Sequence, residues 1–331
     1  MWRIVTATFL GIGLALGGIR ASDSGSTPAL EPLPDLASPY QPYKLKLAYF
    51  YPLPNHAGGV IVHVRINGGR PLRLVLDSGA EFMVVGARVA RAAGLATGPE
   101  IELVGLGGRS ARVGQAQTIE AGPVSFRNCR VLVVDGNVIE GVDGVIPLSL
   151  FSAFQLHLNL PEKTLELIPY AREHDPVIPP THGVTKHNLL LVGAVLNGKQ
   201  SGYVVLDTGA YCSAISPALA RTISGPQVLS EVRLAAGTGA ATGQRVSSTV
   251  HFAIADQDLV PNQVVALDLS NLSRHYGVEV MGVLGFQALT HYVLTVDYLH
   301  QQVKIEAPRN SSTRELQRVQ NVEPPAPLAF R

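Results

Sequence analysis

The sequence contains few of the residues on which several common kinds of protein depend. Its 331 residues include 2 cysteines, 1 tryptophan and 3 methionines, and Asp, Glu, Lys and Arg together make up 15%. With 2 cysteines, a small fold held together by many disulfides is excluded. The formal net charge is +1, so the chain has no excess of positive charge to attract nucleic acid, and we expect no nucleic-acid partner.

Motifs for nucleotides and metals are also missing. Gly105, Gly107 and Gly108 belong to a glycine-rich run that lacks the downstream helix and the final glycine of a dinucleotide-binding motif. The 10 histidines show no metal-ligand spacing, and His182 and His187 lie in a proline-bearing stretch that is typical of a solvated loop. We therefore expect no metal and no other cofactor.

Apolar residues, glycine and proline are abundant instead. Hydrophobic residues make up 46% of the chain, and there are 33 glycines and 23 prolines. This composition suffices for two lobes, each with its own core, and favours many short strands and turns over long helices. We predict an all-β fold with a few short helices, for which the sequence shows patterns at residues 87–93, 148–153, 216–222 and 286–290.

The most informative feature is a short segment that occurs twice. Residues 76–80 read Leu-Asp-Ser-Gly-Ala and residues 206–210 read Leu-Asp-Thr-Gly-Ala, so that Asp77 and Asp207 are 207 − 77 = 130 residues apart. An aspartate at the end of a buried strand is costly unless it is hydrogen-bonded or shares its charge, so two copies indicate that the carboxylates meet. Two carboxylates in contact cannot both ionise, and such a pair holds one proton and can act as acid and base.

The matching register extends far beyond the aspartates. Asn67-Gly68 and Asn197-Gly198, which are both hairpin signals, precede the aspartates by ten residues. Near the end of each copy, residues 144–146 match residues 282–284 with an offset of 282 − 144 = 138, so eight extra residues lie in the middle of the second copy. We interpret the chain as an internal duplication.

Each copy also has a glycine-rich segment between its aspartate and its end, at residues 104–115 and 236–244. Glycines that flank a short polar tip are typical of a β-hairpin. Such a hairpin is either a flap that closes over a cleft or an ordinary surface hairpin, and its position in the repeat favours the flap.

Both copies resemble the retropepsin-like aspartic proteases, the clan that contains retroviral proteases and pepsin-like enzymes. The family pattern is an apolar strand, Asp-Ser/Thr-Gly-Ala, a flap, and then two apolar residues and a glycine before a short helix. The resemblance covers roughly residues 58–169 and 187–306, as in bacterial members with two fused units. It implies two duplicated β-barrel lobes with a cleft between them.

The resemblance assigns the catalytic role to Asp77 and Asp207, which would face each other across a pseudo-two-fold axis and hold a water between them. One carboxylate would take a proton from the water while the other, protonated, donates to the substrate carbonyl oxygen. The resemblance also implies that the hydroxyl groups of Ser78 and Thr208 form hydrogen bonds across the lobe interface and hold the two motif loops together.

The other motif and flap residues are implied to shape the loops or to contact substrate. Gly79 and Gly209 let the backbone turn tightly and offer N–H groups to the carboxylates. Glu81 stands where retroviral relatives have an acid that holds the substrate backbone, and its counterpart Tyr211 cannot do this by charge. The further substrate-binding positions are Ala80, Ala210, Gly107, Gly108, Gly237 and Gly239.

Two features depart from the family pattern. Pro147 stands where the second copy has Gly285, and the family commonly has glycine there. Neither flap has an obvious tyrosine of the pepsin type. Both departures concern the shape of the cleft and leave the aspartate pair intact.

Three segments lie outside the two copies: an N-terminal segment, a linker and a C-terminal tail. Arg3 followed by the apolar run Ile4–Gly18 fits an export signal peptide, with an uncleaved anchor as the alternative, so we expect a periplasmic or secreted protein. The predicted boundaries are residues 1–23 for the signal peptide or anchor, 24–55 for a Pro/Ser-rich spacer, 56–170 for the first lobe, 171–186 for a linker, 187–307 for the second lobe and 308–331 for a disordered tail.

Cys129 and Cys212 lie at non-equivalent positions of the two copies. In an exported protein they either form a disulfide or remain as two buried free thiols.

The leading hypothesis is an aspartic endopeptidase that acts on peptide or protein substrates. The main alternative is a catalytically silent envelope protein with the same fold, which binds an extended peptide or another ligand. A further alternative is a dimer in which each half works with a half of another chain. Because the linker at residues 171–186 joins the two halves, they lose less entropy on pairing within one chain than two halves of different chains would. We therefore expect a monomer with an internal pseudo-two-fold.

Overall fold

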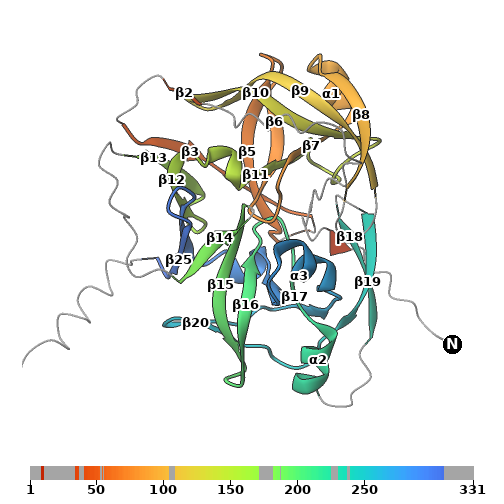
Figure 1. Cartoon of the computed structure of the whole chain (residues 1–331), viewed down its shortest axis with the longest axis vertical. Helices are drawn as coiled ribbons and strands as arrows, with labels where there is room; N and C mark the ends of the chain where they lie inside the picture. Colours follow the sequence, from red (N-terminus) through yellow and green to blue (C-terminus); the bar gives the residue numbers. More distant parts are fainter. Residues whose placement is uncertain are drawn as a thin grey trace, which may run out of the picture.

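The structure is a computed structural model of the whole chain, and it consists of strands with a few short helices (Figure 1). The predicted all-β fold is therefore confirmed. The residues that the structure describes are 9–10, 34–36, 41–52, 54, 56–103, 109–170, 182–186, 188–224, 230–236 and 239–308.

The first lobe begins with an antiparallel hairpin that leads to the first aspartate. Its turn residues Asn67 and Gly68 both have positive φ, 50° and 68°, as this dipeptide adopts in a tight hairpin turn. The elements of this lobe are β4 (Ala48–Phe50), β5 (Gly59–Ile66), β6 (Leu72–Asp77), β7 (Met83–Gly86), α1 (Ala87–Ala92), β8 (Ala96–Leu103), β9 (Arg109–Ala121), β10 (Val124–Val134), β11 (Gly144–Pro147) and the 3-10 helix η1 (Leu148–Phe151), with β2 (Pro34–Leu36) on the edge of β10.

The second lobe repeats this order. Asn197 and Gly198 again have positive φ, 46° and 66°, in the hairpin before the second aspartate. Its elements are β15 (Leu189–Leu196), β16 (Gln200–Leu206), β17 (Ser213–Ile215), α2 (Pro217–Ser224), β18 (Glu231–Ala236), β19 (Gly239–Arg245), β20 (Phe252–Ile254), β21 (Gln257–Leu259), β22 (Val264–Ala266), α3 (Ser270–Tyr276), β23 (Val280–Leu284) and α4 (Phe286–Leu289), with β1 (Phe9–Leu10) on the edge of β18.

Each aspartate follows a strand that lies inside its sheet. In the first lobe, β6 lies between β5 and the parallel strand β11, and Leu74, Val75 and Leu76 are buried. In the second lobe, β16 lies between β15 and the parallel strand β23. Alternate residues of each strand pack into different buried clusters, Val75 on one face of β6 and Leu74 and Leu76 on the other, so both faces are covered and the apolar run is continuous rather than alternating.

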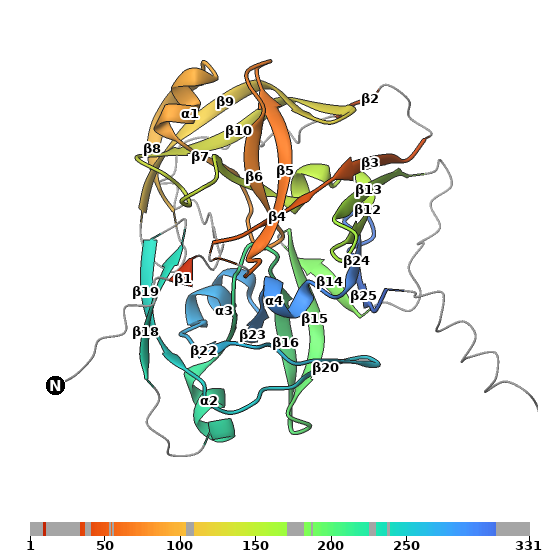
Figure 2. The same ribbon diagram turned by 180° about the vertical axis from the view of Figure 1, so that it is seen from behind.

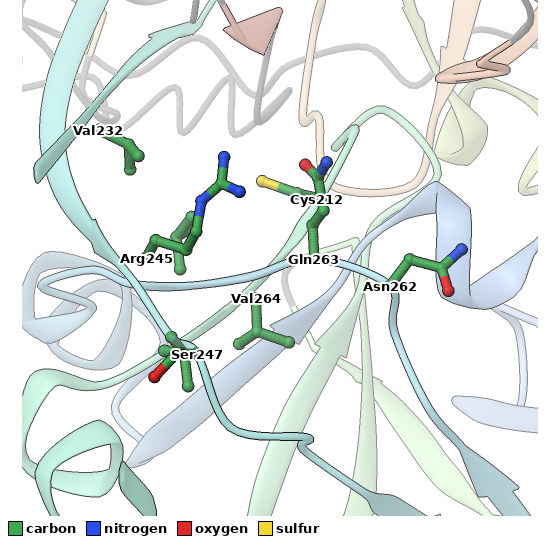
Figure 3. A pocket seen from close by; sticks show the side chains of 9 residues that line it. Cys212, Val232, Arg245, Ser247, Asn262, Gln263 and Val264 are labelled. Carbon is green, nitrogen blue, oxygen red and sulfur yellow. The ribbon is translucent and has the colours of Figure 1, made fainter. Parts of the chain in front are cut away.

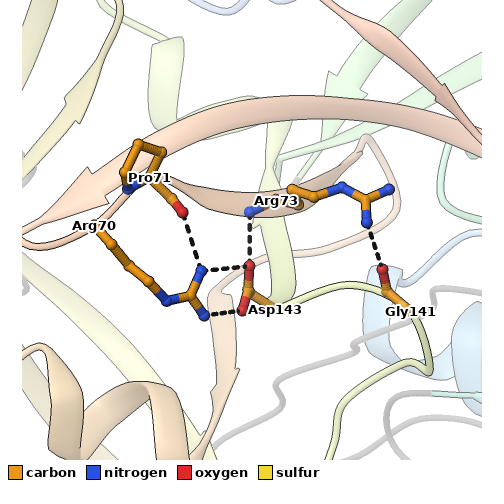
Figure 4. A network of polar contacts seen from close by, with 5 residues as sticks. All are labelled: Arg70, Pro71, Arg73, Gly141 and Asp143. Carbon is orange, nitrogen blue, oxygen red and sulfur yellow. Dashed lines mark hydrogen bonds and ion pairs between the residues drawn. The ribbon is translucent and has the colours of Figure 1, made fainter.

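A polar network fixes the start of β11 on β6 (Figure 4). The side chain of Asp143 forms an ion pair with Arg70 and accepts a hydrogen bond of 2.9 Å from the backbone N–H of Arg73. Burial opposes the charge of Asp143, but these hydrogen bonds and the Arg70 charge lower its pKa below the ordinary value. Because β11 runs beside β6 as far as the Pro147–Asp77 pair, this network helps to position the first aspartate.

The two lobes share a sheet on one side of the molecule, as Figures 1 and 2 show from opposite directions. It contains β3 (Tyr43–Lys46), β13 (Thr164–Pro169), β12 (Phe154–Asn159), β24 (Val293–Asp297), β25 (Gln302–Glu306) and β14 (Gly183–Lys186), in that order. β12 of the first lobe pairs antiparallel with β24 of the second, and His157 faces Thr295, its equivalent at the offset of 295 − 157 = 138. The local two-fold axis therefore passes through this pair, with Leu156 facing Val296 and Leu158 facing Leu294.

Two segments differ from the boundaries expected from the sequence. β3 and β4 lie inside the predicted spacer 24–55, where Tyr43 and Leu45 are buried and β3 pairs with β13. β14 lies inside the predicted linker 171–186 and pairs with β15 and β25. β3 adds to the edge of β13, and β14 lies between β15 and β25, so both short strands depend on distant partners that their own sequences do not show.

Other predictions concern residues outside the described ranges. The signal peptide or anchor at residues 1–23, apart from Phe9–Leu10, and almost all of the tail 308–331 belong to this group. Among the helices that the structure describes, none has the length and apolar character needed to cross a membrane. Cys129 and Cys212 are both buried free thiols, which settles the alternatives left open by the sequence.

We predict that the shared sheet contributes strongly to stability. Leu156 is fully buried in β12, whereas Leu299 is 51% exposed. Leu156→Ala should lower the free energy of unfolding by about 2–5 kcal/mol, because it removes buried methyl groups at the lobe interface, and Leu299→Ala should change it by less than about 1 kcal/mol. Urea unfolding followed by fluorescence measures both variants. Equal effects of the two substitutions would show that the shared sheet is not a main source of stability.

Candidate active site

Asp77 and Asp207 lie at equivalent places, Asp77 as the last residue of β6 and Asp207 directly after β16. Both side chains are fully buried. The N–H of Gly79 donates to Oδ1 of Asp77 at 2.7 Å, and the N–H of Gly209 donates to Oδ1 of Asp207 at 2.9 Å. Each motif loop thus turns back to offer backbone N–H groups to its own carboxyl group.

Reciprocal hydrogen bonds join the two motif loops. The backbone N–H of Ser78 donates to Oγ1 of Thr208 at 3.1 Å, and the N–H of Thr208 donates to Oγ of Ser78 at 3.0 Å. The hydroxyl of Ser78 donates to the carbonyl of Leu206, and that of Thr208 to the carbonyl of Leu76, both at 2.8 Å. All four bonds are buried and cross from one lobe to the other, so each lobe satisfies polar groups of its partner.

The carboxyl groups lie against each other's loops. A Cβ atom placed on Gly79 would lie 2.5 Å from Oδ2 of Asp207, and one placed on Gly209 would overlap the carboxyl group of Asp77. Only glycine therefore leaves room for the opposite carboxyl group at these two positions. The structure brings Asp77 and Asp207 together at the centre of the molecule, where the two motif loops meet.

The environment of the pair favours its protonated form. Oδ2 of each aspartate is buried and has no hydrogen-bond partner within the described part of the chain. Burial, and then the charge of Asp207, raises the pKa of Asp77 well above its ordinary value. Burial also raises the pKa of Asp207, against the opposing effects of Asp77 and then of the loop N–H groups. A pair of this kind retains a shared proton at a pH at which isolated aspartates are ionised.

A third acidic residue connects the first motif loop to the second lobe. Glu81, four residues after Asp77, lies 3.0 Å from Nε2 of His275 in the last turn of α3. The Glu81 side chain is mostly buried, and this pair joins the two lobes beside the aspartates. Tyr211, the counterpart of Glu81, is buried in the second lobe, so the two ends of the site differ chemically.

The remaining predicted residues divide into two groups. Ala80 and Ala210 are buried next to the glycines of their motifs, and Gly239 begins β19. Gly107, Gly108 and Gly237, which the sequence assigned to the flap tips, lie outside the described residues. The hairpins that carry these tips, β8–β9 and β18–β19, lie on the side of the molecule away from the shared sheet in both views (Figures 1 and 2).

The departure at Pro147 has a local explanation. In the second lobe the N–H of Gly285 donates to Oγ of Ser213 at 3.1 Å. In the first lobe the equivalent residues are Pro147, which has no N–H, and Met83, which has no hydroxyl. The second lobe therefore has both the N–H donor and the hydroxyl acceptor, and the first lobe has neither. No polar group of this pair is left without its partner in either lobe.

Sequence reasoning missed α3 and its His275. The eight extra residues of the second copy lie in its middle, and Ala266 and Gly282 are 282 − 266 = 16 positions apart, whereas the equivalent Val133 and Gly144 are 144 − 133 = 11 positions apart. Gly277 has φ of 62° and directly follows α3, which is a common helix end that could have revealed this helix. The described residues include no group of three side chains able to hold a metal ion.

Part of the chain matches a known protein family. Residues 62–148 match a family model described as aspartyl protease, and this segment contains the first motif, β8, β9 and β11. The second motif lies outside the matched residues. No curated protein matches the chain.

We predict that the cross-lobe hydroxyl groups support stability. Thr208→Val keeps the shape of the side chain but leaves the N–H of Ser78 and the carbonyl of Leu76 without a buried partner, so the free energy of unfolding should fall by about 1–3 kcal/mol. Thr208→Ser keeps the hydroxyl and should recover most of this loss. Thermal and urea unfolding of the two variants provide the comparison, and equal stability would contradict the role of the hydroxyl.

We also predict that stability depends on the protonation of the pair. The native pKa values are raised, so the native state holds protons that the unfolded state releases, and stability falls as the pH rises from about 4 through the raised values. Asp207→Asn should flatten this fall, because a tenfold difference in proton affinity between the native and unfolded states corresponds to about 1.4 kcal/mol of stability. The exposed Asp256→Asn is the control and should leave the slope above pH ~4 unchanged. Identical slopes for Asp207→Asn and the parent protein, measured by urea unfolding from pH 4 to 8, would contradict the raised pKa values.

Proposed function

We propose that the chain is an aspartic endopeptidase whose single site is formed by both lobes, because residues 62–148 match a family model described as aspartyl protease. One observation supports this proposal above all others. Asp77 and Asp207 are fully buried against each other's motif loops, with raised pKa values and with one oxygen of each lacking a partner among the described residues. A pair of carboxyl groups that stabilises only the fold does not need two such oxygens in one place.

The proposed chemistry uses the shared proton. For this step we place the shared proton on Asp77 and the charge on Asp207, and the pair as a whole carries one proton because burial raises the pKa of both carboxyl groups. A water held by the two Oδ2 atoms would give a proton to Asp207 as its oxygen attacks the carbonyl carbon, while Asp77 donates its proton to the carbonyl oxygen. The resulting diol would collapse as Asp207 passes its proton to the leaving nitrogen and Asp77 recovers its own. The C–N bond breaks, and the products are a carboxyl group and an amine.

Glu81 would hold the backbone of the substrate on the side of the first lobe. Its pairing with His275 restricts the carboxylate to one orientation, which lowers the entropy lost when a peptide binds. In this proposal His275 acts through Glu81 and is a positioning residue. The second lobe has Tyr211 at the equivalent place and would hold the peptide differently.

The alternative function is binding of an extended peptide without cleavage. It would use the same fold, and the intact Asp-Ser-Gly and Asp-Thr-Gly motifs count against it, because binding alone does not require two facing carboxyl groups. We further propose that the protein works outside the cytoplasm as a monomer, on the evidence of the apolar N-terminal run and the linker length.

We predict that Asp77→Asn and Asp207→Asn each lower kcat/KM for peptide cleavage by at least about 10²–10⁴-fold, because an amide can act neither as the acid nor as the base. The two variants should remain folded, since the substitution removes repulsion between carboxylates. The parent protein should show a bell-shaped dependence of kcat/KM on pH, because the singly protonated pair is the active form.

The measurement is cleavage of a mixed peptide library, analysed by mass spectrometry across pH, with Asp256→Asn as the control that should retain activity. Substantial cleavage by either active-site variant would place the chemistry elsewhere. A parent protein that binds peptides from the library and cleaves none would support the alternative function.

A further inference from the structure

The strand β8 lies at the margin of the first lobe in both views and has an open edge (Figures 1 and 2). It is the last strand of its sheet, and within the described ranges it pairs with β9 and with no other strand. Within those ranges, the backbone groups on its outer side therefore lack a strand partner. An edge of this kind is a template for the pairing of another extended chain.

β18 of the second lobe is the equivalent of β8. Along residues 100–103 of β8 the side chains are exposed, half-buried, exposed and buried in turn, and residues 231–234 of β18 repeat this order. The buried residue of each run, Leu103 or Leu234, belongs to a buried cluster that includes the alanine of the motif in its own lobe. Each strand therefore turns one face toward its motif loop and the other face toward the solvent.

Figure 3 shows what lies at the inner face of the second hairpin. Val232, the half-buried residue of the β18 run, lines a cavity of about 230 Å³ beside the second motif, together with Cys212. Side chains alternate along a strand, so the half-buried Ile101 of β8 likewise lies on the inner face. Glu100 and Glu102 then lie on the outer face of β8.

The outer edge of β18 is already occupied by the chain itself. Phe9 and Leu10 run parallel to it, with Phe9 opposite Leu234 and Leu10 opposite Ala235. This pairing shows that a hairpin of this geometry accepts an extended chain on its outer edge. The equivalent edge of the first lobe, beside Leu103, has no such segment within the described ranges. An extended chain from another molecule can therefore add to β8 by main-chain pairing, which is a common mode of peptide recognition.

The outer face of β8 is acidic. Glu100 and Glu102 are both exposed, and neither forms an ion pair in the part of the chain that the structure describes. Arg112 lies opposite Glu100 on β9, but its guanidinium pairs with Asp135 at 3.0 Å. Glu102 lies opposite Ser110, so no cation lies directly across from it. A second copy of β8 on this edge would bring like charges together, whereas a basic side chain would meet the opposite charge.

We propose that the outer edge of β8 binds an extended peptide segment of another protein in which basic and apolar residues alternate. The segment pairs parallel to β8, as Phe9–Leu10 pairs with β18, and its Lys or Arg side chains lie beside Glu100 and Glu102. Its apolar side chains lie on the inner face, beside Ile101 and Leu103. This surface goes beyond the proposed function, because a protease and a protein that only binds peptides can both use it.

Peptides that differ only in charge test this surface. Fluorescent peptides present Lys-Val-Lys-Val, Gln-Val-Gln-Val or Glu-Val-Glu-Val between the same flanks, and anisotropy measures their binding to the full chain with Asp77→Asn, in which they are not cleaved. We expect the Lys peptide to bind about fivefold more tightly than the Gln peptide, because exposed ion pairs contribute modestly. Glu100→Gln combined with Glu102→Gln should bring this ratio to about 1, and lysine at both positions should reverse the preference in favour of the Glu peptide. Glu162→Gln combined with Glu231→Gln is the matched control, because it removes the same charge at two exposed acids outside β8 and should leave the ratio unchanged.

Methylated peptides test the strand pairing separately from the charge. Methylation of every second backbone nitrogen removes the N–H groups on one side of an extended Lys peptide, and two such peptides cover the two sides. One of them should bind at least about tenfold more weakly than the unmethylated peptide, and the other should bind nearly as well. Equal affinities of the two methylated peptides would overturn the proposed surface, and so would a Lys-to-Gln ratio that the Glu100 and Glu102 variants leave unchanged. Neither result depends on the protease function, which the cleavage assay tests by itself.

Discussion

The cross-lobe hydrogen bonds between Ser78 and Thr208 are the interaction on which the rest of the structure depends. Each hydroxyl accepts from the other motif's N–H and donates to a carbonyl of the other lobe's aspartate-bearing strand. Neither lobe can satisfy these buried groups alone, and leaving them unpaired would cost about 1–3 kcal/mol for each group. The bonds therefore favour docked lobes and hold the two aspartates at a fixed separation.

Much of this arrangement could be predicted from the sequence, because the repeated residues determine the local backbone conformation themselves. The Asn-Gly dipeptides require positive φ, the apolar runs require buried strands, and Asp77 and Asp207 end those strands in the same way. What the sequence did not indicate are the elements whose structure depends on distant partners. β3 and β14 are short strands that form because distant strands pair with them, and α3 places His275 against Glu81 only once the lobes are docked.

At one place near the motif loops the two copies have diverged in a matched pair of residues. Gly285 and Ser213 form a donor and acceptor pair in the second lobe, and Pro147 and Met83 replace both partners in the first. Replacing one partner alone would leave a buried polar group unpaired, which is more costly than the loss of the bond itself. The backbone symmetry is thus kept at this place because both side chains of the pair changed together.

This divergence has a consequence for how a peptide would bind. A site with perfect two-fold symmetry presents the same surface to a peptide in either direction, although a peptide differs between its two ends. Glu81 with His275 on one side has Tyr211 as its counterpart on the other. A charged side chain that meets the wrong half would lose its partner and its hydration together, which penalises one direction much more than the other. In the proposed function, the symmetric frame would therefore hold the aspartates in position, while the asymmetric side chains around them would select one direction of a peptide bound between the lobes.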